Sequence, residues 1–185
     1  GSVAPRPAFS TQEGYPVTPA GTIDSRYSSP GAAPTRWALV NQSLQDAEIF
    51  WISTVRPNGQ PHVTPLIAIW LNGGIHFTTG PDERKALNLA ENPACTMTTG
   101  CNALNDGMDI VIEGAARRIT DHRTLGQLAD RYKSKYDWDF AIKDGTLTDG
   151  DHPALVFGVT PATIFAFSKG EPFAQTRWQF AQDAA

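Results

Sequence analysis

The segment 78–85, Thr-Thr-Gly-Pro-Asp-Glu-Arg-Lys, carries the residue types of an anion-binding site. Arg84 and Lys85 fall in the first turn of a predicted helix, where the helix dipole is positive and free N–H groups point outward. A ligand phosphate could accept hydrogen bonds there from both cations, from the two threonine hydroxyls and from the helix N–H groups. The alternative interpretation is that Asp82 and Glu83 neutralise the turn and both cations point into water, because surface charge pairs are common.

A second candidate feature is the predicted strand segment 62–70, whose alternation places four side chains on one face: Thr64, Leu66, Ala68 and Trp70. Pro65 lies within this segment and cannot donate to a β-ladder, which places it at a sheet edge or a bulge. Open backbone at such an edge could contact a flat ring. Equally, the proline could simply protect the edge from further pairing.

Two other strands present polar side chains that a barrel interior does not need. In the segment 108–119 one face carries Asp109, Val111, Glu113 and Arg117, which could contact a cofactor, a subunit interface or solvent. In the segment 173–180 one face carries Gln175, Arg177 and Gln179, and the other carries Thr176, Trp178 and Phe180. The aromatic face is typical of core packing. Arg177 beside an aromatic ring could instead bind an anionic group.

The elements that must position these residues are mostly strands. Apolar spacing predicts helices near 35–47, 83–91 and 122–136, and strands at 49–55, 60–71, 75–79, 94–99, 108–119, 155–159, 163–167 and 173–180. Turns at Asn58-Gly59 and 72–74 predict that the first three strands pair in succession. Polar loops are expected at 100–107 and 137–153. Many antiparallel strands with few, separated helices predict a mainly β fold, a closed or nearly closed barrel with flanking helices.

The chain is expected to divide into an arm and one domain. Residues 1–33 are rich in proline, glycine and serine and lack apolar periodicity, so burial cannot offset the entropy of ordering them. They are expected to form an extended or disordered arm. The folded domain is expected at 34–185.

Composition excludes several classes of function. The chain has 15 lysine and arginine residues and 19 aspartate and glutamate residues, which gives a net charge of −4, so no nucleic-acid partner is expected. No apolar run is long enough to span a bilayer and the start lacks a secretory pattern, so we expect no membrane partner and a cytoplasmic location. The histidines and the two cysteines, Cys95 and Cys101, match no zinc spacing, which predicts free thiols and no metal site. Phosphate-loop, Rossmann and serine-hydrolase motifs are absent from the sequence.

Three blocks of sequence carry a resemblance to a known family: 54–65 (Thr-Val-Arg-Pro-Asn-Gly-Gln-Pro-His-Val-Thr-Pro), 77–80 (Phe-Thr-Thr-Gly), and 84–89 (Arg-Lys-Ala-Leu-Asn-Leu) before Asn92-Pro93. They resemble the pyridoxamine 5′-phosphate oxidase-like split barrels. The most similar branch is that of the flavin/deazaflavin oxidoreductases, whose members often close with a strand like Thr176 to Phe180. The C-terminal arginine and histidine pattern with which the true oxidases bind substrate phosphate is not evident, so vitamin B6 oxidation is not expected.

The resemblance implies a homodimer with two cofactor sites at the subunit interface. Each would hold FMN or its deazaflavin analogue, coenzyme F(420) (8-hydroxy-5-deazaflavin). By position, the residues that line the ring would be Val63, Thr64, Pro65 and Leu66, and those that hold the phosphate would be Thr78, Thr79, Arg84 and Lys85. Asp109 aligns with a position where the true oxidases carry a ring-contacting glutamine. Arg177 and Trp178 would close the site, from the same or the neighbouring subunit.

The resemblance therefore favours an oxidoreductase that transfers a hydride between F(420) and a conjugated small organic acceptor. The cofactor would carry the chemistry, and no catalytic side chain stands out in the sequence. An FMN-dependent oxidase or reductase of the same fold is the first alternative. The second is a non-catalytic flavin- or haem-binding protein, and a haem would need an axial ligand such as His62 or His76.

Overall fold

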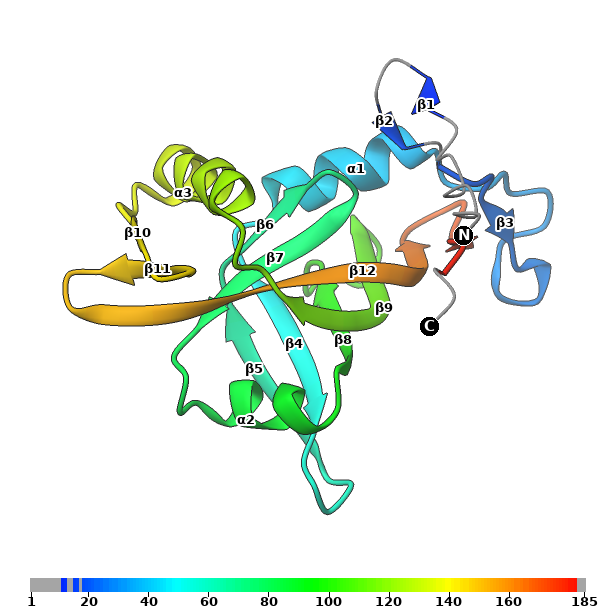
Figure 1. Cartoon of the computed structure of the whole chain (residues 1–185). Helices are drawn as coiled ribbons and strands as arrows, with labels where there is room; N and C mark the ends of the chain where they lie inside the picture. Colours follow the sequence, from blue (N-terminus) through cyan, green and yellow to red (C-terminus); the bar gives the residue numbers. More distant parts are fainter. Residues whose placement is uncertain (1–10, 13–14, 17, 183–185) are drawn as a thin grey trace, which may run out of the picture.

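The long strand β12 (His152–Ser168) is the central element of the computed structural model, which describes residues 11–12, 15–16 and 18–182. The first half of β12 pairs with β7 (Gly74–Thr79) on one side. The other side pairs with β9 (Met108–Arg118) along most of its length. The second half also pairs with β13 (Ala174–Gln179), so β12 passes from one side of the barrel to the other (Figure 1).

The remaining strands complete an eleven-stranded sheet in which all pairs are antiparallel. Its main path runs in the order β10-β11-β12-β9-β8-β4-β5, while β6 pairs with β7 and β3 with β13. The bounds of these strands are β3 (Thr22–Ile23), β4 (Phe50–Val55), β5 (Pro61–Leu66), β6 (Ala68–Leu71), β8 (Ala94–Thr99), β10 (Ala141–Lys143) and β11 (Thr146–Asp149). A separate pair joins β1 (Thr11–Gln12) to β2 (Tyr15–Pro16). The predicted mainly β split barrel is confirmed.

The split in the barrel lies between β5 and β6. They follow each other in the chain with only Ile67 between them, yet they do not pair with each other. The single strand predicted at 60–71 is therefore wrong, because it is divided into β5 and β6, whereas the two predicted turns do join paired strands, β4 to β5 and β6 to β7. Pro65 removes a ladder donor just before the break, and among the described strands β5 pairs with β4 alone, which leaves its other edge open.

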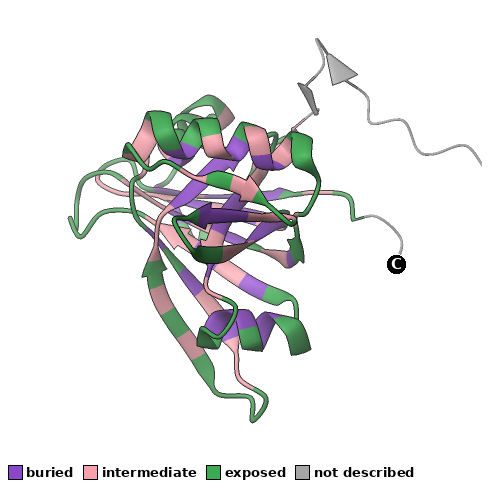
Figure 2. Cartoon of the chain, turned by 60° about the vertical axis from the view of Figure 1, so that its left-hand side comes forward, coloured by how far each residue is buried: buried purple, intermediate pink, exposed green. Residues whose placement is uncertain are grey.

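Three helices surround the barrel (Figure 1). Near one end lies α1 (Trp37–Asp46), and at the opposite end lies α2 (Arg84–Glu91). On the outside of the sheet, α3 (His122–Tyr136) packs against β6, β10 and β11. Residues that are buried lie on the strands of the barrel and on the helix faces turned toward them (Figure 2). The helix predicted at 122–136 is confirmed, and its apolar side chains Leu125, Leu128 and Tyr132 are fully buried.

The structure corrects two predictions in the last third of the chain. The polar segment 137–153, predicted as a loop, contains the hairpin β10–β11. The two strands predicted at 155–159 and 163–167 are one strand, because the register shift between Pro161 and Thr163 is a bulge that interrupts pairing with β9 without ending β12.

Part of the predicted arm belongs to the folded domain. β3 pairs with β13, and the short 3-10 helix η1 (Ser25–Tyr27) follows it. The hydroxyls of Ser28 and Ser29 accept from the backbone N–H groups of Gln175 and Phe173, both at 3.0 Å. The ordered domain therefore begins before the predicted boundary near residue 34. The prediction for residues 1–10, 13–14 and 17 lies outside the described residues. In the part of the chain that is described, no helix is long and apolar enough to cross a membrane.

Candidate functional site

Helix α2 presents Arg84 and Lys85 in its first turn, as predicted, and the fold holds this turn close to β4 and β5. Gly80-Pro81 ends β7, and α2 begins at Arg84 after a turn. The inward face of α2 includes Asn88, whose Nδ2 donates to Thr54 Oγ1 on β4 at 3.0 Å in a fully buried contact. This bond fixes the helix over the mouth of the barrel.

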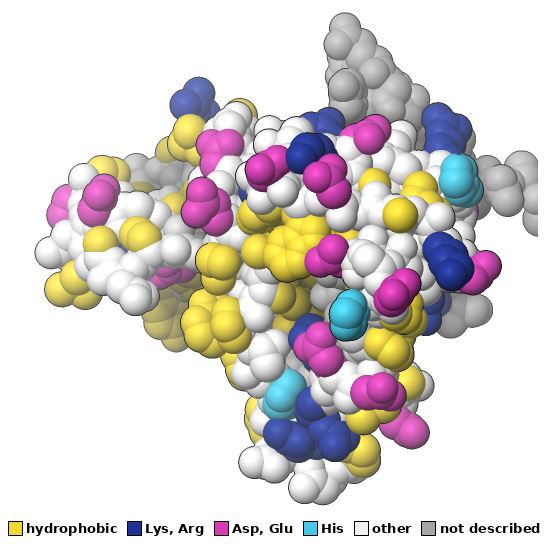
Figure 3. Space-filling view, turned by 90° about the vertical axis from the view of Figure 1, so that its left-hand side faces the viewer, with side chains coloured by type: hydrophobic (Ala, Val, Ile, Leu, Met, Phe, Trp, Pro, Cys, Tyr) yellow, Lys and Arg dark blue, Asp and Glu magenta, His cyan; other side chains and the backbone are white. Residues whose placement is uncertain are grey.

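Four basic side chains meet at this end of the molecule: Arg56, His62, Arg84 and Lys85. Burial lowers the pKa of His62, and the positive charges of Arg56, Lys85 and Arg84 lower it further. The three cations therefore lie close enough to affect one imidazole. Figure 3 shows Lys and Arg side chains gathered beside a histidine at the lower end of the molecule. These four residues, called the basic cluster below, create a positive potential suited to a multiply charged anion.

One carboxylate already engages the basic cluster. Glu83 accepts from the Gly80 N–H at 2.9 Å and from the ammonium of Lys85, a side chain that is only 9% exposed. Burial raises the pKa of Glu83, but the hydrogen bonds from Lys85 and Gly80 outweigh it and leave the pKa below its usual value. The neutralising interpretation is thus correct in pairing Glu83 with Lys85 but wrong in placing Lys85 in water, because the Lys85 side chain is buried. The same two donors, an ammonium and a backbone N–H ahead of a helix, are those that a phosphate uses.

Buried polar atoms without partners gather around the same place. They are Arg56 Nε, His62 Nδ1, Thr64 Oγ1 and Asn88 Oδ1, and none of them has a hydrogen-bond partner among the described residues. An unsatisfied buried polar atom typically costs about 1–3 kcal/mol, so four near the start of α2 are unusual for a purely structural region. A phosphorylated ligand with further polar groups fits this set of donors and acceptors.

The four residues predicted to line a ring on β5 divide between two faces. Thr64 and Leu66 lie opposite the core residues Ile52 and Phe50, so they face the barrel interior. Val63 and Pro65 face outward, and Val63 is 52% exposed. All four lie on β5, and every second residue of this strand directs its backbone groups to the edge away from β4, where no other described strand pairs.

The two threonines at the end of β7 also diverge. Thr79 is 2% exposed, points into the barrel, and its Oγ1 donates to the Gly80 carbonyl at 3.2 Å. Thr78 points to the other face of the sheet, where it meets Tyr132 of α3. Thr79 therefore adjoins the turn that precedes α2, whereas Thr78 supports the packing of α3.

The remaining predicted residues lie away from the basic cluster. A row of cross-strand partners on the outer face joins Pro65, Trp51, Thr98, Val111, Phe165 and Arg177. Five strand spacings of about 4.8 Å put Arg177 about 24 Å from Pro65 along the sheet. Arg177 and Pro65 therefore cannot contact the same ring within one chain.

Asp109 and Trp178 have structural partners of their own. Asp109 Oδ1 accepts from Lys169 Nζ at 3.1 Å and from the Cys101 N–H at 3.2 Å, which fixes the loop before β9. Trp178 is 1% exposed and packs edge-on against Trp37 with ring centroids 5.5 Å apart. The core-packing interpretation of its face is confirmed.

Sequence reasoning gave no phosphate-binding role to Arg56, His62 or Asn88. Asn88 follows Lys85 by three residues and Arg84 by four, a spacing that places it beside both on the surface of a helix. The sequence alone could therefore have indicated Asn88. The positions of Arg56 and His62 depend on the β4–β5 pairing. His76, the other proposed haem ligand, is 9% exposed and closely covers Gly158 of the adjacent strand. Within the described ranges, no group of three His, Cys, Asp or Glu side chains is placed to hold a metal.

Comparisons with known proteins show which family and which solved structures share this fold. The family model for pyridoxamine 5′-phosphate oxidase matches residues 38–167. No curated protein sequence matches the chain. The fold is similar to that of an FAD-binding protein from Mycobacterium smegmatis, at 16% identity and a TM-score of 0.54, covering 80% of this chain and 100% of that one.

Two further solved structures share the fold. An F(420) reductase is 20% identical with a TM-score of 0.50, covering 66% of this chain and 94% of that one. A haem-binding protein from Mycobacterium smegmatis is 12% identical with a TM-score of 0.58, covering 78% and 59%. The family match contains β4 to β9, α2, α3 and nearly all of β12, which together form the split barrel and the basic cluster. The chain therefore belongs to the pyridoxamine 5′-phosphate oxidase family.

Proposed function

We propose that this protein is an oxidoreductase that binds a phosphorylated flavin or deazaflavin, with the phosphate at the basic cluster. The observation that carries the proposal is the convergence of Arg56, His62, Arg84 and Lys85, together with four buried polar atoms that have no partner among the described residues. A phosphate there would replace the Glu83 carboxylate as the acceptor for Lys85 and the Gly80 N–H.

The open edge of β5 is the surface that would hold the ring. Its free backbone groups can bond the polar edge of a flavin-type ring, and Pro65 keeps another strand from pairing there. A bound flavin or deazaflavin supplies the hydride chemistry, and the chain's own contribution is to orient the ring and fix its electrostatics. No side chain at this edge is assigned a proton-transfer role.

We infer that F(420) is the preferred cofactor and that a conjugated small organic acceptor is the substrate. The Arg-Lys-x-x-Asn-Leu helix, with Asn88 tied to β4, supports this choice because it resembles the deazaflavin users. The fold shared with a protein described as an F(420) reductase agrees with it. FMN also carries a phosphate at the end of its ribityl chain that the basic cluster could bind, so it is the competing cofactor.

We also infer that the functional unit is a homodimer formed through the outer face of the sheet. That face exposes Trp51 (48%) and Val63 (52%), and Phe165 stacks on Phe167 with centroids 6.1 Å apart. An exposed apolar row of this kind is typical of an interface. A second copy would also be able to bring its Arg177 toward the ring on β5, which the same chain's Arg177 cannot reach.

The experiment that tests the cofactor proposal is a parallel fluorescence-quenching titration of the apo-protein with FMN and with F(420). We expect tighter binding of F(420), and we expect Arg84→Ala with Lys85→Ala to weaken binding of both cofactors by more than ten-fold, because two charge-assisted contacts are lost. The control is Arg123→Ala with Lys143→Ala, which removes the same charge from exposed positions elsewhere. Equal affinities of the two double variants would contradict the proposed phosphate site.

The homodimer is tested by light scattering after size-exclusion chromatography. Trp51→Arg is expected to shift the protein from dimer to monomer, because it places a charge at the centre of the apolar row. Trp138→Arg is a matched control, since Trp138 is similarly exposed, at 44%, but follows α3 on another surface. A wild-type protein that elutes as a monomer at micromolar concentration would contradict the homodimer.

A further inference from the structure

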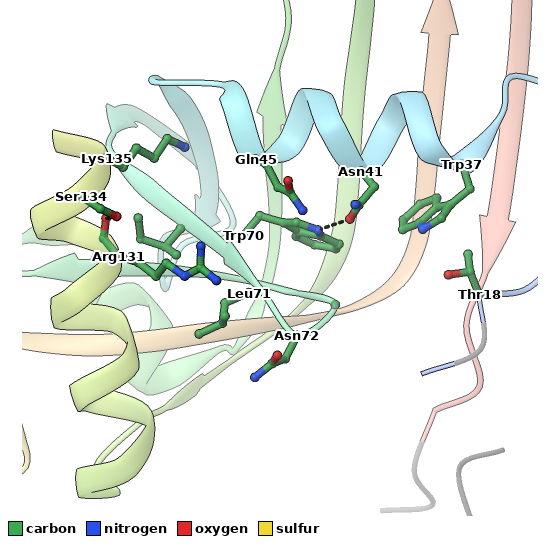
Figure 4. Close-up of a pocket in the computed structure, with 12 residues that line it drawn as sticks. Thr18, Trp37, Asn41, Gln45, Trp70, Leu71, Asn72, Arg131, Ser134 and Lys135 are labelled. Atoms are coloured by element: carbon green, nitrogen blue, oxygen red, sulfur yellow. Dashed lines mark hydrogen bonds between the residues drawn. The ribbon is translucent and has the colours of Figure 1, made fainter. Parts of the chain in front are cut away.

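A second cavity lies at the end of the barrel opposite the basic cluster. It has a volume of about 560 Å³ and is bounded by α1, α3 and the β6–β7 hairpin (Figure 4). Cavities of about 300–1,000 Å³ are the usual size for small-molecule sites. None of its lining residues belongs to the basic cluster or to the β5 edge. Its chemistry is therefore independent of the proposed cofactor site.

Two tryptophans supply the apolar walls of this cavity. Trp37 on α1 and Trp70 on β6 lie 6.4 Å apart, with their ring planes inclined at 62°. The indole Nε1 of Trp70 donates to Asn41 Oδ1 at 2.8 Å, which fixes both side chains. Asn41 uses its oxygen in this bond, so its amide nitrogen remains as a donor. Rigid aromatic walls with fixed polar groups favour a planar aromatic ligand.

The charged groups of the cavity are all positive. Arg131 and Lys135 line it, and no Asp or Glu does. Lys135 already donates to the Ala47 carbonyl at 2.5 Å, and burial lowers its pKa against the smaller opposing effect of Asp46 and Glu48.

Arg131 differs from Lys135 in its contacts. Its side chain reaches from α3 toward β6, across the cavity (Figure 4), and it forms no ion pair with any residue in the described ranges. A guanidinium beside tryptophans is well suited to bind a carboxylate in two parallel hydrogen bonds. Gln45, which points from α1 toward the same space, adds a further amide.

We propose that this cavity is a second ligand site, which binds a small aromatic carboxylate with the ring packed against Trp37 and Trp70 and the carboxylate on Arg131. The proposal does not depend on the identity of the cofactor or on its binding.

The test uses three matched probes and calorimetric titration of the full chain. They are indole-3-acetate, its neutral amide indole-3-acetamide, and cyclohexylacetate, which keeps the charge but lacks the aromatic ring. We expect saturable binding of indole-3-acetate and at least ten-fold weaker binding of the other two. Indole-3-acetamide binding as tightly as the acid would overturn the role of charge, and cyclohexylacetate binding as tightly would overturn the role of the aromatic walls.

Two variants locate the binding. Arg131→Gln is expected to weaken indole-3-acetate by about ten-fold, whereas Arg123→Gln, an exposed arginine on the same helix that does not line the cavity, leaves it unchanged. Gln45→Glu adds a carboxylate and is expected to weaken binding as well. In NMR spectra of the labelled protein, the Trp70 indole N–H signal should move on titration while that of Trp138 stays. No Trp70 shift, or equal effects of the two arginine variants, would overturn the site.

Discussion

Replacing Glu83 by glutamine is expected to increase the affinity of the basic cluster for phosphate. The carboxylate of Glu83 holds two donors of the cluster, the Gly80 N–H at 2.9 Å and the ammonium of Lys85. A phosphate ligand must displace it and also approach its negative charge. Glutamine keeps the length and shape of the side chain but binds Lys85 much more weakly, so it competes less with phosphate for the two donors.

The size of the effect follows from the exposure of the pair. Hydrogen bonds to charged groups are worth about 1.5–3 kcal/mol when well buried. The Glu83 side chain is 52% exposed, although Lys85 is only 9% exposed, so solvent screening reduces the competing interaction to about 1 kcal/mol. Since 1.4 kcal/mol corresponds to ten-fold, the expected gain in affinity is about five-fold.

The assay is a quenching titration with FMN, repeated with inorganic phosphate as competitor. Phosphate alone reports on the basic cluster without any contribution from the ring. The control variant is Asp82→Asn, which removes the same charge from the neighbouring exposed position without breaking a contact to Lys85. If Glu83→Gln binds phosphate and FMN no more tightly than Asp82→Asn, Glu83 does not compete for the site and the assignment of its two donors is wrong.

Three further predictions concern stability and reactivity. Burial lowers the pKa of His76, so as the pH falls below about 6.5 the unfolded chain takes up a proton before the folded protein does. The free energy of unfolding, measured by urea denaturation, should therefore fall between pH 7.5 and pH 5.5. It should fall less steeply in the His76→Gln variant. Burial raises the pKa of Cys95 to about 11, so a disulfide reagent should modify only the exposed Cys101 in the native protein and both thiols in denaturant. Trp178→Ala should cost about 3–5 kcal/mol and lower the Tm by about 10 °C in a thermal melt, whereas Arg177→Ala on the exposed face should leave it nearly unchanged.

Short-range patterns in the sequence were enough to determine several helices, strands and turns of this protein. The period of two in β4 and β9, the helical stripe on α3 and the Asn58-Gly59 turn, where Gly59 has φ +84°, depend on residues near one another in the chain. The same holds for Arg84 and Lys85 at the start of α2, since Gly80-Pro81 and Asn92-Pro93 bound that helix on either side. These features give the fold class and one half of the basic cluster.

Tertiary pairing decided the rest, because it depends on which strands become neighbours. Only the β4–β5 pairing brings Arg56 and His62 to α2, and only packing against Thr54 turns Asn88 inward. The continuity of β12 through Pro161 required a partner strand that could accept a bulge. The separation of Pro65 from Arg177 likewise follows from the order of strands between them, which no local spacing encodes.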